Sequence, residues 1–334
     1  MSPPPVPWRR MAWVTWRQHR LTLIGVPGLL GALAVYLLIA GLRSHRAYAA
    51  LIACQPAGSP GCGNLGAGFS STYWTQADIV LIFLNLAPAL IGAFAGAPVL
   101  ARELETGTYR YAWTQGVGRE RWTIAKLALL AATVTAAAGA LSQLFAWFFQ
   151  PFLGQENLTV LAASVFGTRG IAFAAWTLAA FAIGALAGLL IRRIVPAMAV
   201  TLGAYAGLAL ATRVFLRERY LPAVVTSNPD FSSRPGTGGS PWVLRTWFTG
   251  PGGRVTSQPA IDRLLRAYQP GGRSAQAPAA NDLARVLAQH GYTQHASYIP
   301  VSRFWPMQLI EGGWLLALSV LLIAVTVWLV RRAA

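Results

Sequence analysis

Charged residues are scarce in this sequence. They make up 11% of the 334 residues, less than half the roughly 25% of an ordinary soluble protein, whereas hydrophobic residues make up 55%. Acidic residues are scarcer still, with 10 Asp and Glu against 27 Lys and Arg. Because a surface in water needs more charge than this, the composition excludes an ordinary soluble protein and indicates a chain whose solvent is largely lipid.

The basic residues do not form a nucleic-acid-binding surface, although the formal net charge is +17. They stand in short clusters at the ends of apolar runs rather than along one continuous stripe. This distribution is typical of membrane topology and not of a phosphate-binding face. We therefore expect a lipid membrane as a partner and no nucleic acid.

Cysteine and histidine are too few to build a metal site. The chain has two cysteines, Cys54 and Cys62, and four scattered histidines, so we expect no metal. On an oxidising face of a membrane the two cysteines would pair and close a small loop rich in Pro and Gly. Such a bridge is worth roughly 2–3 kcal/mol by chain-entropy estimates. We favour this disulfide; the alternative is two free thiols.

The chain also lacks a phosphate-binding P-loop, which requires Gly-Lys-Ser/Thr. Its sole lysine, Lys126, follows Ala125 and leads into an apolar run. We therefore expect no enzymatic activity by that route and no cofactor in this chain. If the protein is a pump, a separate ATPase must bind ATP and Mg²⁺ and supply the energy.

Six apolar segments are long enough to cross a hydrocarbon core, which takes about 20 residues at 1.5 Å each. They are Leu21–Leu42, Asp78–Leu100, Thr123–Phe149, Gly170–Ile191, Val195–Phe215 and Gln308–Val330. The fourth and fifth are so close together that they must form a tight helical hairpin. The sequence predicts an all-α integral membrane protein with six transmembrane helices.

The basic residues fix the orientation. An even number of spans puts both termini on one side of the membrane, and we place that side in the cytoplasm by the positive-inside rule. Three basic residues then lie in the short outer loops: Arg43, Arg46 and Arg169. Thirteen lie on the inner side: Arg9, Arg10, Arg17, Arg20, Arg102, Arg110, Arg119, Arg121, Lys126, Arg192, Arg193, Arg331 and Arg332.

The spans divide the chain into four parts. Residues 1–20 are an imperfectly amphipathic segment, expected to lie as a helix in the cytoplasmic interface or to contact a cytoplasmic partner. Residues 21–216 hold the first five helices, with a cytoplasmic turn at 101–122. Residues 217–307 are rich in Gly, Pro and Ser, which predicts a mostly irregular extracellular insertion. Residues 308–334 form the sixth helix and a cytoplasmic tail.

Polar residues in or at the edge of the spans are candidates for a gate or a transport pathway. Asn85 and Gln143 lie deeper and could form hydrogen bonds between helices, where packing roles outnumber transport roles. Asp78, Arg213 and Glu311 all lie within about one turn of the outer surface. A pair of Arg213 with Glu311 or with Asp78 would brace an outer gate; the alternative is solvation at the interface.

The cytoplasmic turn after the second span carries a family resemblance. It reads Arg102-Glu-Leu-Glu-Thr-Gly-Thr108, then Ala112-Trp-Thr-Gln115 and Arg119-Glu-Arg-Trp122. This resembles the permeases of type-2 ATP-binding-cassette (ABC) exporters, especially the short actinobacterial ones. Ser302-Arg-Phe-Trp-Pro-Met-Gln-Leu-Ile-Glu311 looks like the segment by which these permeases enter their last span. The outer segment matches only loosely.

The resemblance implies that this turn couples the permease to an ATPase subunit. The implied coupling residues are Arg102, Glu103, Glu105, Thr106, Gly107, Thr108 and Arg110. Gly107 permits a sharp turn, and Glu103 and Glu105 offer carboxylates to basic groups of a partner. Because these two lie two residues apart, their side chains should diverge on a helix, which suits one internal and one external partner. The alternative is that Glu103 and Glu105 pair with Arg102, Arg110 or Arg119 and merely fold the loop.

The resemblance further implies half of an exporter in a bacterial plasma membrane. Two such permeases, as identical copies or as paralogues, would line a pathway gated by two cytoplasmic ABC ATPases and would export an amphipathic compound, a drug-like molecule or a lipid. A membrane-embedded enzyme would need a cluster of acids, histidines or serines at one depth, which the sequence does not show. A membrane sensor or scaffold that binds a ligand through its extracellular segment is the alternative we retain.

Overall fold

The structure, a computed structural model, describes residues 8–56, 59–106, 119–154, 159–228, 240–257, 259, 261 and 287–332; for residues 8–27, 29, 106, 119, 120 and 154 it describes the helical backbone alone. Among these residues, five helical segments are long and apolar enough to cross a membrane. They are Pro60–Glu105, Arg121–Phe148, Gly170–Ile191, Ile194–Arg219 and Val301–Arg332. The predicted helical membrane class is confirmed at this level, and each segment contains all or nearly all of one predicted span.

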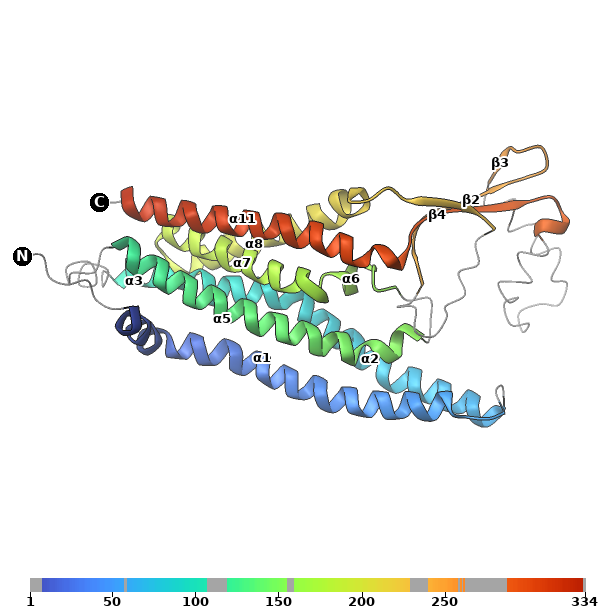
Figure 1. The fold of residues 1–334 in the computed structure, drawn as a ribbon, viewed down its shortest axis with the longest axis horizontal. Helices are drawn as coiled ribbons and strands as arrows, with labels where there is room; N and C mark the ends of the chain where they lie inside the picture. The colour runs from blue at the N-terminus through green and yellow to red at the C-terminus, as the bar shows by residue number, and fades with distance from the viewer. Residues whose placement is uncertain are drawn as a thin grey trace, which may run out of the picture.

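The first predicted span, Leu21–Leu42, lies inside helix α1 (Trp8–Ile52). This helix of 45 residues runs without interruption past residue 20, so the predicted boundary between an interface helix and the first span is not a break in the helix. Helix α1 packs along α5 (Arg119–Phe148), where the imidazole of His45 stacks on the indole of Trp147 at 4.7 Å (Figure 1). We keep six spans as a prediction.

The second span belongs to one continuous helical rod that changes its winding in its last third. It comprises α2 (Pro60–Ile91), the π-helical turn η1 (Gly92–Gly96) and α3 (Pro98–Thr106). The Ser59 hydroxyl caps its start by accepting a hydrogen bond from the Cys62 N–H at 3.3 Å. The turn η1 falls where this rod packs most closely against another helix.

Two Gly-x-x-x-Gly motifs make that close contact. Gly92 and Gly96 belong to η1, and Gly184 and Gly188 belong to α7 (Gly170–Ile191). A Cβ atom added at Gly92 would lie 2.6 Å from the Ala180 carbonyl oxygen, and one at Gly184 would overlap the Gly92 carbonyl oxygen. Paired small residues let transmembrane backbones approach in this way.

Helices α7 and α8 (Ile194–Ala211) form the predicted tight hairpin. Arg192, with φ of 60°, ends α7 in the left-handed conformation. Helix α7 lies at the centre: 61% of its apolar stretch is buried within the protein, against 11% for α8. A π-helical turn, η3 (Thr212–Leu216), and a 3-10 turn, η4 (Arg217–Arg219), continue α8 toward the sheet.

The insertion after the fifth predicted span is not mostly irregular in its described part, which corrects that expectation. It contains an antiparallel sheet of four strands in the order β1-β4-β2-β3. The strands are β1 (Val224–Ser227), β2 (Trp242–Thr249), β3 (Val255–Thr256) and β4 (Thr293–Ile299). Tyr298 of β4 pairs with Val224 of β1 on one side and with Val243 of β2 on the other, so β4 lies between β1 and β2.

The chain returns to the bundle through helix α11 (Phe304–Arg332), preceded by the turn η5 (Val301–Arg303). Short elements η2 (Gln150–Gly154) and α6 (Ala163–Phe166) join α5 to α7. The start of α1, the ends of α3 and α11 and the start of α8 all lie at one end of the bundle; the sheet lies beyond the other end (Figure 1). That both termini share one side of a membrane stays a prediction.

Candidate functional site: buried ion pairs at the two ends of the bundle

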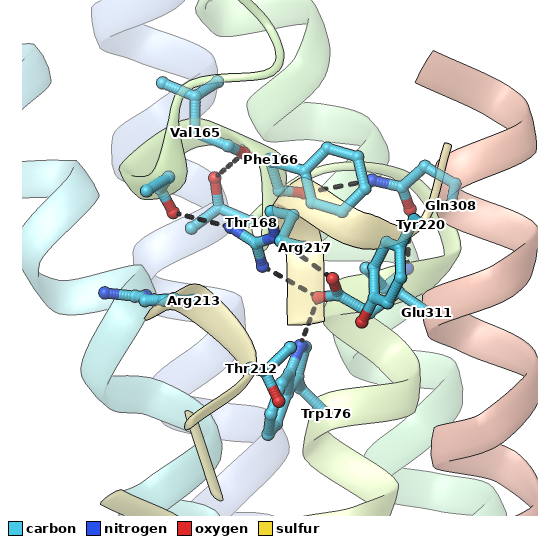
Figure 2. Close-up of polar contacts among 12 residues, drawn as sticks. Val165, Phe166, Thr168, Trp176, Thr212, Arg213, Arg217, Tyr220, Gln308 and Glu311 are labelled. Carbon is cyan, nitrogen blue, oxygen red and sulfur yellow. Dashed lines mark hydrogen bonds and ion pairs between the residues drawn. The ribbon is translucent and has the colours of Figure 1, made fainter. Parts of the chain in front are cut away.

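A buried ion pair joins Glu311 of α11 to Arg217 of η4. Glu311 Oε1 accepts from Arg217 Nη2 at 2.8 Å, and Oε2 accepts from Arg217 Nε at 3.1 Å. The Glu311 and Arg217 side chains are 0% and 2% exposed. Figure 2 shows this two-pronged contact, which matches the fork of the guanidinium to both carboxylate oxygens.

Neighbouring groups form further hydrogen bonds with both members of this pair. Trp176 Nε1 of α7 donates to Glu311 Oε1 at 2.8 Å, and Arg217 Nη1 donates to the Ala163 carbonyl of α6 at 3.3 Å. The Arg217 guanidinium also lies over the Phe166 ring, 4.6 Å from its centroid. The pair therefore fastens η4, α6, α7 and α11 to one another.

Gln308 and Tyr220 lie beside the pair and extend the cluster (Figure 2). Gln308 Oε1 accepts from the Ala172 N–H in the first turn of α7 at 2.8 Å, and its Nε2 donates to the Phe166 carbonyl at 3.0 Å. The Tyr220 hydroxyl accepts from Trp314 Nε1 at 2.9 Å. Burial, and after it the nearby Glu311 carboxylate, raises the pKa of Tyr220 to about 12.

The expected pair of Arg213 with Glu311 or with Asp78 is corrected by this geometry. Arg213 Nη2 instead donates to Asn85 Oδ1, and Asn85 Nδ2 donates to the Ser164 carbonyl at 2.9 Å. Asp78 and Gln143 are exposed on α2 and α5 and do not line the Glu311 cluster. Of the candidate gate residues, the structure thus brings Asn85 together with Arg213 and places Glu311 in a separate buried cluster.

Sequence reasoning missed Arg217 because hydropathy ends the fifth span at Phe215. Arg217-Glu-Arg219 is then interpreted as the solvated end of this span. The π-helical turn η3 and the 3-10 turn η4 instead direct Arg217 inward. The signal that was available is Glu311, a carboxylate in an apolar run, because a buried charge requires a partner of opposite sign.

A second buried ion pair lies at the other end of the bundle. Lys126 of α5 is fully buried, and its Nζ donates to Glu103 Oε1 of α3 at 2.8 Å and to the Val99 carbonyl. The Glu103 side chain is 16% exposed. The lysine that the sequence shows to be outside any P-loop thus fastens α5 to the end of α3.

The neighbouring acid of the cytoplasmic motif also has a partner inside the chain. Glu105 Oε2 accepts from the Ile194 N–H at 3.0 Å, where that amide opens α8 directly after the α7–α8 turn. A carboxylate at a helix start satisfies a free amide and suits the helix dipole. Within the part of the chain that the structure describes, both carboxylates thus contact this chain, Glu103 through Lys126 and Glu105 through the Ile194 amide. The expectation of one internal and one external partner stays a prediction.

The other predicted coupling residues are described only in part. Arg102 is exposed on α3, and Thr106 ends that helix. Gly107, Thr108 and Arg110 lie outside the described residues. The coupling role of the whole set stays a prediction.

Cys54 and Cys62 are joined by a disulfide. It lies between the end of α1 and the first turn of α2, at the end of the bundle opposite the start of α1 (Figure 1). Among the described residues, no group of three or more His, Cys, Asp or Glu side chains is placed to hold a metal ion.

The arrangement suits controlled movement better than bond chemistry. In the part of the chain that the structure describes, the charges of these two pairs meet each other, and the cavity beside Arg217 has a volume of only about 10 Å³, too small for a reactant. Because separating such pairs leaves a charge uncompensated, the helices they join should move together or exchange partners in a discrete step.

Comparison with known proteins shows the family of this chain. Among curated proteins and solved structures, none matches the chain. The model of the family described as ABC-2 membrane transporter related matches residues 27–217, which is more than half of the chain. The chain therefore belongs to the ABC-2 membrane transporter related family and is a multi-pass membrane permease of the ABC-2 type.

Proposed function

We propose that this permease forms half of an ATP-driven exporter in a bacterial plasma membrane. It would cross the membrane six times with both termini in the cytoplasm, pair with a second copy or a paralogue, and work with a separate ABC ATPase that binds ATP and Mg²⁺. The family membership supports a transport role. The bias of basic residues toward one side supports the orientation.

The observation that carries the coupling mechanism is the fastening of α3 to two other helices. Glu103 joins it to Lys126 of α5, and Glu105 joins it to the start of α8. The chain leaves α3 at Thr106 and returns at the start of α5, so the segment between them is anchored on helices that are already linked. A push by an ATPase on residues 107–118 would then move α3, α5 and α8 as a unit.

Helix α8 with its extensions η3 and η4 runs from the Glu105 contact at one end of the bundle to the Arg217–Glu311 pair at the other. Its first residue, Ile194, contacts Glu105 at one end, and Arg217 contacts Glu311 at the other. These positions are 23 residues apart, or about 35 Å of helix, which exceeds the roughly 30 Å thickness of a hydrocarbon core. We infer that α8 transmits cytoplasmic movement to the Glu311 cluster and so to an outer gate.

The test is Glu105→Ala in the full-length chain. Glu105 is exposed, and losing a helix cap costs about 0.5–2 kcal/mol, so insertion and folding should survive. Tagged protein is purified with its co-expressed ATPase, reconstituted, and assayed for ATP hydrolysis and for efflux of amphipathic dyes. Retained ATPase with lost efflux supports transmission through Glu105. Glu218→Ala is the matched control, since it removes an exposed carboxylate from η4, at the other end of the extended α8. Equal efflux from the wild type and Glu105→Ala would overturn the mechanism.

Single cysteines at Ser2 and at Ala334 test the orientation in a background without Cys54 and Cys62. We expect a membrane-impermeant maleimide to label both positions only after the cytoplasmic face is opened. Labelling of either from outside intact cells would contradict the orientation. If the protein is instead a sensor or scaffold, which is the alternative function, it should purify without an ATPase and should not stimulate ATP hydrolysis by one.

A further inference from the structure

An apolar groove lies between α5 and the last half of α11. It is lined by Ile124, Val320, Ile323, Ala324, Val327, Trp328 and Arg331, and its volume is about 380 Å³. This is at the lower end of the roughly 300–1,000 Å³ typical of ligand sites. Every lining residue except Arg331 offers apolar surface, so the groove suits a hydrocarbon chain rather than a polar solute.

The dimensions of the groove match one leaflet of a bilayer. From Val320 to Arg331 the helix rises about 16 Å, and half of a roughly 30 Å hydrocarbon core is about 15 Å. Its polar end coincides with the end of α11, where a lipid headgroup would lie. An extended acyl chain along α11 would therefore reach from the middle of the membrane to its surface.

Positive charge gathers at that polar end. Arg331 lines the groove, Arg332 stacks over Trp328 with its guanidinium carbon 4.0 Å from the ring centroid, and Arg121 is exposed one turn before Ile124 on α5. Residues three apart share a helix face, so Arg121 lies on the side of α5 that carries Ile124. Basic residues at the cytoplasmic ends of transmembrane helices attract anionic headgroups.

We propose that this groove is a binding site for one anionic phospholipid of the inner leaflet. The acyl chain lies along Val320–Val327, Trp328 marks the interface, and the phosphate lies by Arg331 and Arg332. The choice of leaflet rests on the orientation given under the proposed function; the binding itself does not depend on transport. A neutral lipid would fill the groove but would not carry the net negative charge that Arg331 and Arg332 attract.

The experiment is lipid retention by the full-length protein. Detergent-purified protein is incubated with phosphatidylglycerol and phosphatidylcholine of identical chains, and bound lipid is measured by native mass spectrometry. We expect the wild type to retain phosphatidylglycerol preferentially. In R331Q/R332Q this preference should fall roughly 25-fold, since each surface arginine contributes about five-fold. R43Q/R46Q removes the same charge from two exposed arginines of α1 at the other end of the bundle and should leave the preference unchanged.

Two further variants test the acyl part of the site. Ala324→Trp places a large ring in the groove and should lower retention of both lipids, whereas Leu321→Trp, on an exposed part of α11 outside the lining, should not. Equal retention of the two lipids by the wild type, or equal loss in R43Q/R46Q, would overturn the proposal. So would a wild-type dimer that Ala324→Trp dissociates, since the groove would then be a protein interface. Because no assay uses efflux or ATP, failure here is distinguishable from failure of the exporter function.

Discussion

Glu311 and Arg217 lie 94 residues apart in the sequence and form a buried ion pair with a closest N–O distance of 2.8 Å. Neither side chain is accessible to solvent beyond 2%. Desolvating both charges costs several kcal/mol per ion, and the bidentate contact together with the bonds from Trp176 and to Ala163 offsets that cost. Such a pair contributes little net stability, but it penalises any structure that separates its members.

Glu311→Ala should therefore destabilise the protein by about 3–5 kcal/mol, because Arg217 would remain buried without a counter-charge. The measurement is the midpoint of thermal unfolding in detergent, followed by Trp fluorescence. Replacing both members, as R217M/E311L, should cost less than Glu311→Ala alone, although Trp176 would still lose its acceptor at about 1–3 kcal/mol.

Arg213→Met provides the matched control for this cluster. Arg213 is exposed and donates to the neutral Asn85, so its loss should cost no more than about 1 kcal/mol. A Glu311→Ala protein that unfolds at the wild-type temperature would show that Arg217 finds water or another partner, and the pair would then not act as a fastening.

Glu103→Ala should destabilise the opposite end of the bundle, because it removes the counter-charge of the fully buried Lys126 and leaves, among the described residues, the Val99 carbonyl as its partner. We expect a loss of about 2–4 kcal/mol, reduced because a buried lysine can lose its proton. E103L/K126M should recover most of this loss, and Glu103→Gln, which keeps an oxygen acceptor, should fall between. Equal unfolding midpoints for Glu103→Ala and E103L/K126M would contradict a charge-based cost.

The Cys54–Cys62 disulfide predicts that intact cells expose no thiol of this protein until a reductant is added. C54S/C62S should lower stability by roughly 2–3 kcal/mol on the chain-entropy estimate for a short loop. The measurements are alkylation with a membrane-impermeant maleimide and thermal unfolding with and without reductant. Prompt alkylation of both cysteines in untreated native protein would rule the bridge out, and the serine variant should show no change of midpoint on reduction.

The helices were predictable because long apolar runs dominate this sequence. The predicted span Gly170–Ile191 coincides with α7, and the Arg192–Arg193 turn is where the hairpin was expected. The sheet was not predictable in the same way: β3 has only two residues, and the longer strands β2 and β4 do not alternate strictly between apolar and polar residues. Family membership, predicted from the motif after the second span and the segment before the last, is confirmed.

The ion pairs could not be predicted from the hydropathy of the sequence. Which of Arg213, Arg217 and Arg219 meets Glu311 depends on the winding of η3 and η4, and this cannot be read from composition. Lys126 and Glu103 are 23 residues apart on separate helices, so no helical spacing links them.

The glycine motifs can be recognised in the sequence, because Gly92-Ala-Phe-Ala-Gly96 and Gly184-Ala-Leu-Ala-Gly188 are both typical of close helix contact.

These glycines give the last prediction, in which Gly184→Ala and Gly188→Ala should each destabilise the protein by about 1–3 kcal/mol. A Cβ at Gly184 would overlap the Gly92 carbonyl oxygen, and one at Gly188 would overlap the Ala97 carbonyl oxygen. Both obstacles are backbone atoms, so no side-chain rotation relieves them and α7 must move away from the second span. Gly203→Ala in α8 is the control: its Cβ would meet nothing within 4 Å, and alanine favours helix by up to about 1 kcal/mol. Thermal unfolding of the three variants decides the matter, since a Gly184→Ala protein as stable as Gly203→Ala would mean that the two helices do not pack this closely.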